Sequence, residues 1–141
     1  MQNIFLGSSN LPRALDDLRY IAMLVQEENF NPLPWNKADV LPLGSYILDS
    51  LRELCKKVDR AIFIFNEDDQ VEHQNNYIFK PRGNVIFEYA LFVEALGRDK
   101  VIICRRGNPA IPSDLNGIMY CDLDKGYRAE IELLSWLRRT H

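Results

Sequence analysis

The sequence predicts an α/β fold built on a doubly wound parallel sheet, and three observations carry that prediction. Short apolar runs alternate along the chain with longer segments in which apolar residues recur at helical spacing. Ala61–Phe65 is apolar without interruption, which is typical of a strand that helices cover on both faces. Helical segments of about 10–15 residues separate the strands, and this spacing indicates right-handed βαβ units in one sheet.

The first half of the chain supplies two strands and two helices of this pattern. Asn3–Leu6 is the first predicted strand, and a helix follows over Leu11–Glu28. Asn31–Trp35 is a weaker strand with two prolines, which places it at an edge of the sheet. Ser45 is positioned to cap the second helix. The expected inner face of that helix consists of Ile47, Leu48, Leu51, Leu54 and Val58.

The second half continues the alternation and completes the sheet. The predicted strands are Arg60–Phe65, Val101–Cys104 and Ile118–Leu123, and the predicted helices are Asn84–Gly97 and Arg128–Arg139. The apolar face of the last helix is expected to contain Ile131, Leu134, Trp136 and Leu137. Asn66–Gly83 is predicted to be a long polar loop, and Pro112–Asn116 a single turn. Five parallel strands in this arrangement fit a flavodoxin-like sheet of strand order 2-1-3-4-5, with ligands at the carboxyl ends of the strands.

Composition excludes several classes of function. The chain has 141 residues, 47% of them apolar and 26% charged, which predicts one folded domain over residues 1–141. A net charge of −3 without a basic stripe gives no reason to expect a nucleic-acid partner. No signal peptide is visible, and the apolar helical run Tyr89–Val93 is too short to cross a membrane. We therefore expect a cytoplasmic protein with no membrane partner.

The cysteines and histidines show no metal-site pattern. Cys55, Cys104 and Cys121 are widely spaced and include no CxxC pair, so they are expected to be core residues in a reducing compartment. The only histidines are His73 and His141. No metal site is predicted.

Several polar residues near the predicted strand ends are candidates for ligand binding. Gly7-Ser8-Ser9-Asn10 precedes the first helix, where free N–H groups favour a phosphate, with simple helix capping as the alternative. Trp35 follows the second strand, where it either stacks on a nucleobase or packs half-buried. Asp68 and Asp69 lack the spacing of calcium ligands and are expected to form a turn. Asp114 is placed to cap a turn.

Glu88 is the most informative single residue. It lies inside an apolar helical stretch, three residues after Val85 and four before Phe92, so it shares a helix face with both. A carboxylate in that position is costly unless it has a partner or faces a cleft. The alternative is an acid that complements the helix dipole. Glu94, farther along the helix, is expected to be solvated.

Six segments in this order resemble the bacterial TIR-like, predicted nucleotide-binding domains of cyclic-oligonucleotide antiphage systems. They are FLGSS (5–9), residues 35–51 with GSYILDSL at their end, FNEDD (65–69), PRGNVIFE (81–88), LGR (96–98) and IPSDLNG (111–117). The resemblance covers about residues 3–123, and NVIFE and IPSDL at this spacing are its specific parts. In those systems the domain is fused to a sensor such as a STING or SAVED module.

The resemblance implies an NAD⁺ glycohydrolase that needs no cofactor, because NAD⁺ is its substrate. The family's catalytic glutamate falls on Glu88, and its acid in the PSDL turn falls on Asp114. The turn at Gly7, Ser8 and Ser9 is implied to lie near the dinucleotide phosphates. Trp35, Ser45 and Arg82 are implied to line the same cleft. Many relatives have an acid where this chain has Gly83, which leaves any role of that side chain open.

The resemblance also implies activation by assembly into oligomers or filaments, triggered by a ligand-bound cyclic-nucleotide sensor. The chain ends at His141, so we expect an isolated effector domain or the amino-terminal part of a longer protein. Two alternatives stay open. One is a nucleoside deoxyribosyltransferase-like enzyme, which shares the predicted fold and a catalytic glutamate. The other is a non-enzymatic TIR module that works by self-association alone.

Overall fold

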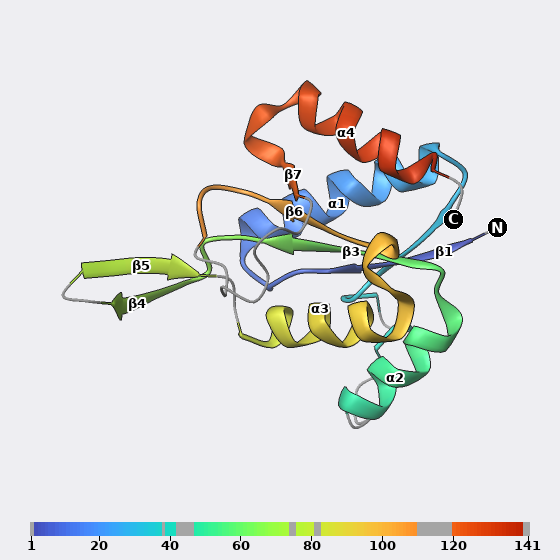
Figure 1. Ribbon diagram of the computed structural model, residues 1–141, viewed down its shortest axis with the longest axis horizontal. Helices are drawn as coiled ribbons and strands as arrows, with labels where there is room; N and C mark the ends of the chain where they lie inside the picture. Colours follow the sequence, from blue (N-terminus) through green and yellow to red (C-terminus); the bar gives the residue numbers. More distant parts are fainter. Residues whose placement is uncertain are drawn as a thin grey trace.

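The computed structural model describes residues 2–37, 39–41, 47–73, 76–80, 83–109 and 120–139. A five-stranded, all-parallel sheet forms the centre of the domain, with strand order β2-β1-β3-β6-β7 (Figure 1). Its strands are β1 (Asn3–Gly7), β2 (Asn31–Pro34), β3 (Arg60–Phe65), β6 (Val101–Arg105) and β7 (Tyr120–Asp122). The predicted order 2-1-3-4-5 of a doubly wound sheet is therefore confirmed.

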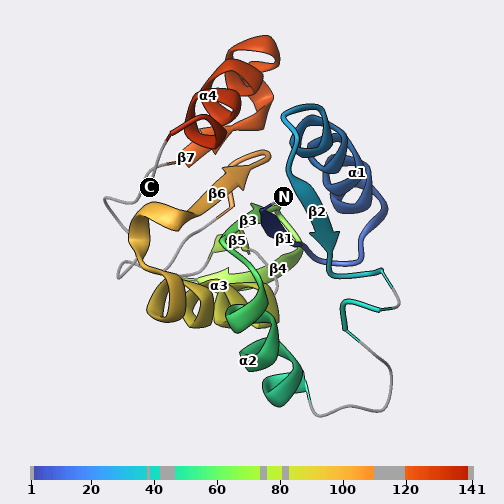
Figure 2. The same cartoon turned by 90° about the vertical axis from the view of Figure 1, so that its right-hand side faces the viewer.

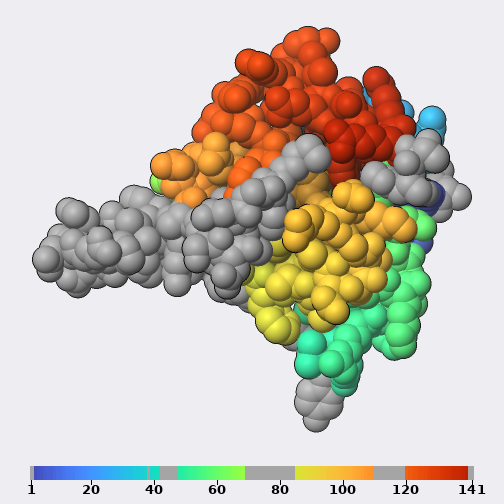
Figure 3. Space-filling model, viewed as in Figure 1, coloured from blue at the N-terminus to red at the C-terminus, as the bar shows by residue number. Residues whose placement is uncertain are grey.

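Helices cover both faces of the sheet, as Figure 2 shows: α1 and α4 lie on one face, and α2 and α3 on the other. The helices are α1 (Pro12–Glu27), α2 (Ile47–Lys57), α3 (Gly83–Leu96) and α4 (Tyr127–Leu137), with single 3₁₀ turns at η1 (Arg98–Lys100) and η3 (Leu123–Lys125). In the space-filling view α2 and α3 lie side by side (Figure 3). No helix in the described ranges combines the length and the apolar character needed to cross a membrane.

The central strand β3 explains why its sequence is apolar without alternation. Ile62 and Ile64 pack under α1 and α4, whereas Phe63 and Phe65 pack under α2 and α3. Each fully buried aliphatic or aromatic side chain of this kind contributes about 1.5–3 kcal/mol to folding. Because both faces are covered, β3 forms the boundary between two apolar cores and has no solvent-facing side.

One prediction about secondary structure was wrong. Asn66–Gly83 is not a loop throughout, since β4 (Asp69–His73) and β5 (Asn76–Lys80) form an antiparallel hairpin with Asp69 opposite Lys80 and His73 opposite Asn76. The hairpin is a separate two-stranded sheet that extends away from the main sheet (Figure 1). Its two strands pair only with each other. A strand outside the packed layers needs no buried apolar face, so its sequence looks like a polar loop.

Two predicted inner-face residues also lie elsewhere. Leu48 in the first turn of α2 is 41% exposed, although the later members of that face are buried as predicted. In α4 the buried stripe contains Ala129, Leu133 and Leu137, while Ile131 is 49% exposed. Residues two positions apart on a helix point about 200° from each other, so Ile131 faces away from this stripe.

The predicted core position is confirmed for two of the three cysteines. Cys104 and Cys121 are buried in the core beneath α1 and α4, Cys55 is half-buried on α2, and all three are free thiols. The remaining strands and helices match their predicted positions within a few residues at each end.

Candidate active site

The carboxyl ends of β1, β3 and β6 meet at one edge of the sheet, because parallel strands all end on the same side. Hydrogen bonds join the segments that leave these strands. The Ser9 hydroxyl donates to Asp68 Oδ1 at 2.6 Å, Arg13 Nη2 donates to the Glu67 carbonyl at 2.6 Å, and the Arg106 amide donates to the Phe65 carbonyl at 2.9 Å. The structure therefore brings together the turn after β1, the end of β3 and the start of the segment after β6.

The hydroxyls of Ser8 and Ser9 are buried and take part in bonds within the chain. Ser8 Oγ accepts a hydrogen bond from Trp35 Nε1 at 2.9 Å and donates to the Ser9 carbonyl at 2.8 Å. Neither serine caps α1, whose N-cap residue is Leu11 and has no side-chain cap bond. Capping by these two serines is therefore excluded, and their hydroxyls instead connect the turn to the end of β2 and to the end of β3.

Trp35 is held by its backbone as well as its indole. Its amide donates to the Leu6 carbonyl at 2.9 Å, and its half-buried ring packs against both apolar cores. Of the two alternatives for this residue, the structure agrees with half-buried packing. The hydrogen bond from the indole to Ser8 links the end of β2 to the turn that follows β1.

Position 7 requires glycine because the backbone of β1 lies very close to the Phe63 ring of β3. A Cβ atom at this position would lie 2.6 Å from the Phe63 ring, which is too close for any side chain unless Phe63 moves. Phe63 in turn contacts Tyr89 of α3 edge-on, with ring centroids 5.8 Å apart. The last residue of β1 is thus connected through one aromatic ring to the residue that follows Glu88.

Glu88 lies in the second turn of α3, half-buried, on the flank that faces α2. Successive residues on a helix are 100° apart. Glu88 therefore lies between the core-facing pair Val85 and Phe92 and the pair Leu91 and Ala95, which line a groove against α2. The first turn of α3 contains no acidic residue, so Glu88 is not positioned to complement the helix dipole. Glu94 is exposed, as predicted.

Burial raises the pKa of the Glu88 carboxyl to about 7. Desolvation penalises the charged form, and no compensating cation acts on this carboxyl among the described residues. Such a carboxyl is close to half-ionised at neutral pH. It can hold or release a proton near pH 7, and its charge acts strongly because little water screens it.

Three predicted site residues, Ser45, Arg82 and Asp114, lie outside the described residues, as does the predicted turn Pro112–Asn116. Ser8, Ser9 and Trp35 form one hydrogen-bonded cluster at the carboxyl ends of β1 and β2, directly after Gly7. Glu88 is on the α2 and α3 side of the same sheet.

Two buried polar residues at this edge were not among the predicted site residues. Asn66 is 1% exposed, and neither its amide nitrogen nor its amide oxygen has a partner in the described part of the chain. Asp17 on α1 is 8% exposed and accepts two bonds from Arg106, at 2.7 and 3.1 Å. Asp17 could have been found from the sequence, because it is an acid within the apolar stripe that includes Ala14, Leu18 and Ile21.

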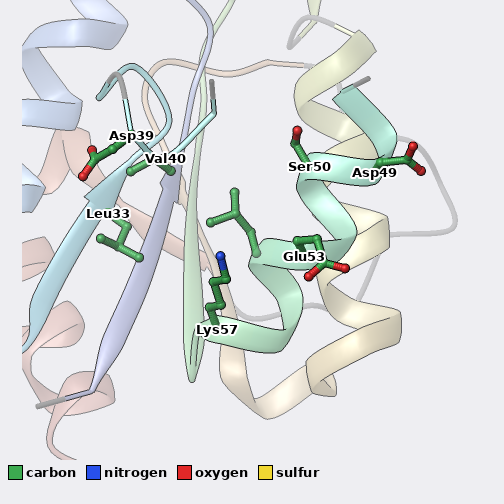
Figure 4. A pocket seen from close by; sticks show the side chains of 8 residues that line it. Leu33, Asp39, Val40, Asp49, Ser50, Glu53 and Lys57 are labelled. Atoms are coloured by element: carbon green, nitrogen blue, oxygen red, sulfur yellow. The ribbon is translucent and has the colours of Figure 1, made fainter. Parts of the chain in front are cut away.

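A separate groove of about 390 Å³ lies beside the open edge of the sheet (Figure 4). In that view Leu33 and Val40 lie across from Ser50 and Lys57 of α2. Asp39, Asp49 and Glu53 make its rim acidic. None of the candidate residues described above lines this groove.

Comparisons with solved structures confirm the fold. The chain is similar to a prokaryotic SEFIR domain, with a TM-score of 0.68 and 13% identity over 99% of this chain and 94% of that one. It is also similar to the 2-deoxyribosyltransferase of Bacillus psychrosaccharolyticus, with a TM-score of 0.60 and 13% identity over 85% of each chain. At this level of identity the likeness concerns the fold alone.

Comparisons by sequence give the family. The chain is 33% identical to CD-NTase-associated protein 12 of Sphingobacterium faecium over 117 residues, which are 83% of this chain and 35% of that protein. It is 36% identical to the Pycsar effector protein PaPycTIR of Pseudomonas aeruginosa over 107 residues, 74% of this chain and 34% of that protein. The chain thus spans about one third of the length of these curated relatives.

The family described as CAP12/Pycsar effector protein, TIR domain, matches residues 3–125. That match includes every strand of the main sheet and the helices α1, α2 and α3. The chain therefore belongs to the family of TIR domains found in CAP12 and Pycsar effector proteins.

Proposed function

We propose that this TIR domain is an NAD⁺ glycohydrolase that serves as an effector of antiphage defence. The observation that carries the proposal is Glu88, a half-buried carboxyl with a pKa of about 7 on the α2-facing flank of α3. Membership of a family of effector domains supports the defence role, since the relatives are effectors by name.

The chemistry of the nicotinamide–ribose bond suits a single buried carboxylate. When the bond breaks, its electron pair passes to the ring nitrogen, which neutralises the pyridinium, and positive charge develops on the ribose as in glycoside hydrolysis. A carboxylate in a weakly screened site stabilises that charge. Water then adds to the anomeric carbon and loses a proton, which Glu88 can accept. The leaving group is already cationic, so no strong general acid is needed.

The turn after β1 supports placement of the dinucleotide phosphates. The N-cap residue of α1, Leu11, makes no side-chain cap bond, and the positive end of the helix dipole lies at this turn. Because the hydroxyls of Ser8 and Ser9 already have partners within the chain, backbone N–H groups are the better candidates for phosphate contact. The roles of Trp35, Ser45, Arg82 and Asp114 in lining the cleft stay predictions.

The remaining part of the proposal concerns activation. The curated relatives are more than twice as long as this chain, and their names call them a CD-NTase-associated protein and a Pycsar effector protein. We propose that the domain works with a sensor of a cyclic nucleotide and becomes active when copies of it are held together.

The test is nicotinamide release from NAD⁺, measured by chromatography with the domain dilute and then tethered at high density. Release should appear on tethering and fall by about 100-fold or more in Glu88→Gln. Glu94→Gln is the matched control, because Glu94 is an exposed glutamate on the same helix.

Two outcomes would contradict the proposal. Equal release by wild type and Glu88→Gln would remove Glu88 from the chemistry. No release from the tethered, folded domain would favour a module that acts by self-association alone. A parallel incubation with a 2′-deoxynucleoside and a free base tests the deoxyribosyltransferase alternative, which predicts base exchange.

A further inference from the structure

Cys104 and Cys121 lie directly opposite each other on the neighbouring parallel strands β6 and β7. Neighbouring strands are about 4.8 Å apart, so the Cα atoms of paired residues lie within the range of roughly 4.4–6.8 Å that disulfides span. Both side chains are on the same face of the sheet, because both belong to the apolar core under α1 and α4. The backbone therefore places the two sulfur atoms where a single bond can join them.

The two thiols already interact. A hydrogen bond between them raises the pKa of Cys104 and lowers the pKa of Cys121. The Cys121 thiol also donates to the Ala129 carbonyl of α4 at 3.2 Å, which fixes the position of its sulfur. Because the thiolate is the form that reacts with oxidants, Cys121 is the member of the pair that reacts first.

The third cysteine differs from this pair in both respects. Cys55 is half-buried on α2, and burial raises the pKa of its thiol. It packs on the opposite face of the sheet, in the core under α2 and α3, so the sheet itself separates Cys55 from the other two sulfurs. Cys55 therefore serves as an internal control within the same chain.

An oxidant reaches the pair through a local opening of the fold, because both sulfurs are buried. β7 is suited to such an opening. It is the last strand of the main sheet, it is three residues long, and the structure pairs it with β6 at three positions. Short segments with few contacts open at a lower free energy than the central strands of a sheet. Hydrogen peroxide is small enough to enter during such an opening.

We propose that Cys104 and Cys121 form a reversible disulfide when the domain meets hydrogen peroxide. The Cys121 sulfur attacks one peroxide oxygen, the O–O bond breaks, water leaves, and a sulfenic acid remains. The Cys104 sulfur then attacks the Cys121 sulfur, and the hydroxyl group leaves as water with the Cys104 proton. The two thiols are oxidised by the same two electrons that reduce the peroxide to water.

The bond fastens the edge strand β7 covalently to β6. Residues 105–120 lie between the two cysteines in the sequence, so the bond also closes a covalent loop that contains Asp114. Closing a loop of this length restricts the unfolded chain and stabilises the folded one. The inference goes beyond the proposed function, and it does not depend on NAD⁺.

The direct test is peptide mapping after hydrogen peroxide treatment of the folded wild-type domain. Free thiols are then alkylated in denaturant, and the domain is digested with trypsin without a reductant. Trypsin places Cys104 in residues 101–105, Cys121 in residues 107–125 and Cys55 in residues 53–56. The first two peptides should appear as one linked species, two hydrogens lighter than their sum, while Cys55 stays alkylated. Dithiothreitol should restore both single peptides. Alkylated Cys104 and Cys121, or unlinked sulfinic and sulfonic acids at these positions, would overturn the proposal.

Variants show that the link is specific and lies within one chain. Cys55→Ser is the matched control and should give the same linked peptide as wild type. Cys104→Ser and Cys121→Ser should give no linked peptide and no change in mobility on a non-reducing gel. Oxidised wild type should stay a monomer on that gel. A covalent dimer, or a link that involves Cys55, would overturn the pairing. If either pair variant fails to fold, the peptide map of wild type and Cys55→Ser still decides.

Thermal unfolding tests whether the bond fastens β7. The linked domain should unfold about 5–10 °C above the reduced one, and dithiothreitol should reverse the shift. Cys55→Ser should show the same shift, whereas Cys104→Ser should show none. A fully linked sample that unfolds at the temperature of the reduced domain would overturn the proposed fastening of β7.

Discussion

Two sets of polar residues in this domain differ in how their polar groups are satisfied. In the turn after β1, every described hydroxyl and indole has a partner: Trp35 donates to Ser8, Ser8 to the Ser9 carbonyl and Ser9 to Asp68. At Glu88 and Asn66 the opposite holds, since burial raises the pKa of one and the other has no described hydrogen-bond partner. The hydrogen bonds of the first region are explained by the stability that they give to the fold. The second region costs stability, which is the usual mark of groups kept for a ligand or a reaction.

The largest effect on stability is expected from removing the indole of the first region. Trp35→Ala should lower the free energy of unfolding by about 3–4 kcal/mol, because the ring packs against both cores and Ser8 loses its donor. Denaturant unfolding measures this loss. Trp35→Phe keeps most of the packing and should cost about 1–2 kcal/mol. A loss below about 1 kcal/mol for Trp35→Ala would mean that the turn does not depend on this residue.

The next prediction concerns Glu88 and pH. The pKa of Glu88 is about 7 in the folded domain and 4.5 unfolded, so the folded state holds a proton that the unfolded state releases between these values. Stability from this group is present below pH 4.5 and is lost as pH rises through about 7, by roughly 3 kcal/mol at most. Glu88→Gln should remove that slope in unfolding measured across this range. If the free energies of unfolding of wild type and Glu88→Gln depended on pH in the same way, this prediction would be contradicted.

The rate of nicotinamide release should rise with pH, whereas the stability contribution of Glu88 falls. If the ionised Glu88 carboxylate stabilises the ribose cation, nicotinamide release should rise about tenfold per pH unit below 7 and level off above it. The same ionisation would thus raise activity and lower stability. A rate that falls as pH rises through 7 would instead assign the protonated acid to the chemistry.

A smaller effect is expected from Gly7→Ala. The added methyl group would lie 2.6 Å from the Phe63 ring, so the ring or β1 must shift, which costs about 2 kcal/mol. Thermal unfolding measures the loss. Combining the change with Phe63→Leu should recover part of it, because the ring that clashes is gone. Full stability of Gly7→Ala alone would show that β1 can move away from β3.

The smallest effect should come from Ser9→Ala, which removes one hydrogen bond to Asp68 and costs about 1 kcal/mol. The comparison predicts that turnover changes only as far as the population of folded protein changes. Stability and nicotinamide release measured at the same temperature test this. A larger fall in release would assign the Ser9 hydroxyl to the substrate and blur the distinction between the two regions.

The parts of the fold that could be predicted are those that packing dictates. β3 has to be apolar on both sides because two helical layers cover it, and that requirement is visible in Ala61–Phe65. The β4–β5 hairpin could not be predicted, because strands that pair only with each other need no apolar face. Ile131 was placed wrongly because α4 offers apolar residues on more than one side, and only the packed structure selects among them.

The residues of the candidate site likewise include some that the sequence reveals and some that only the structure reveals. Glu88 could be found from the sequence because an acid in a helix that is apolar on nearly all sides breaks the pattern. Asn66 could not, since a single amide after a strand is ordinary and becomes unusual only when the structure shows its burial without a described partner. Three-dimensional contacts, rather than residue type, distinguish the serines that hold the turn from buried polar groups without a described partner.

The prolines of β2 have a consequence for how copies of this domain can meet. The amides of Asn31 and Trp35 donate inward to β1, at the Gln2 and Leu6 carbonyls. Because successive amides of a strand point to opposite sides, positions 32 and 34 face outward, and both are proline. The open edge therefore offers no donor at either position, and another strand cannot extend the sheet there by regular pairing. Edge-to-edge fibre growth is blocked at β2 by the covalent structure of the chain itself.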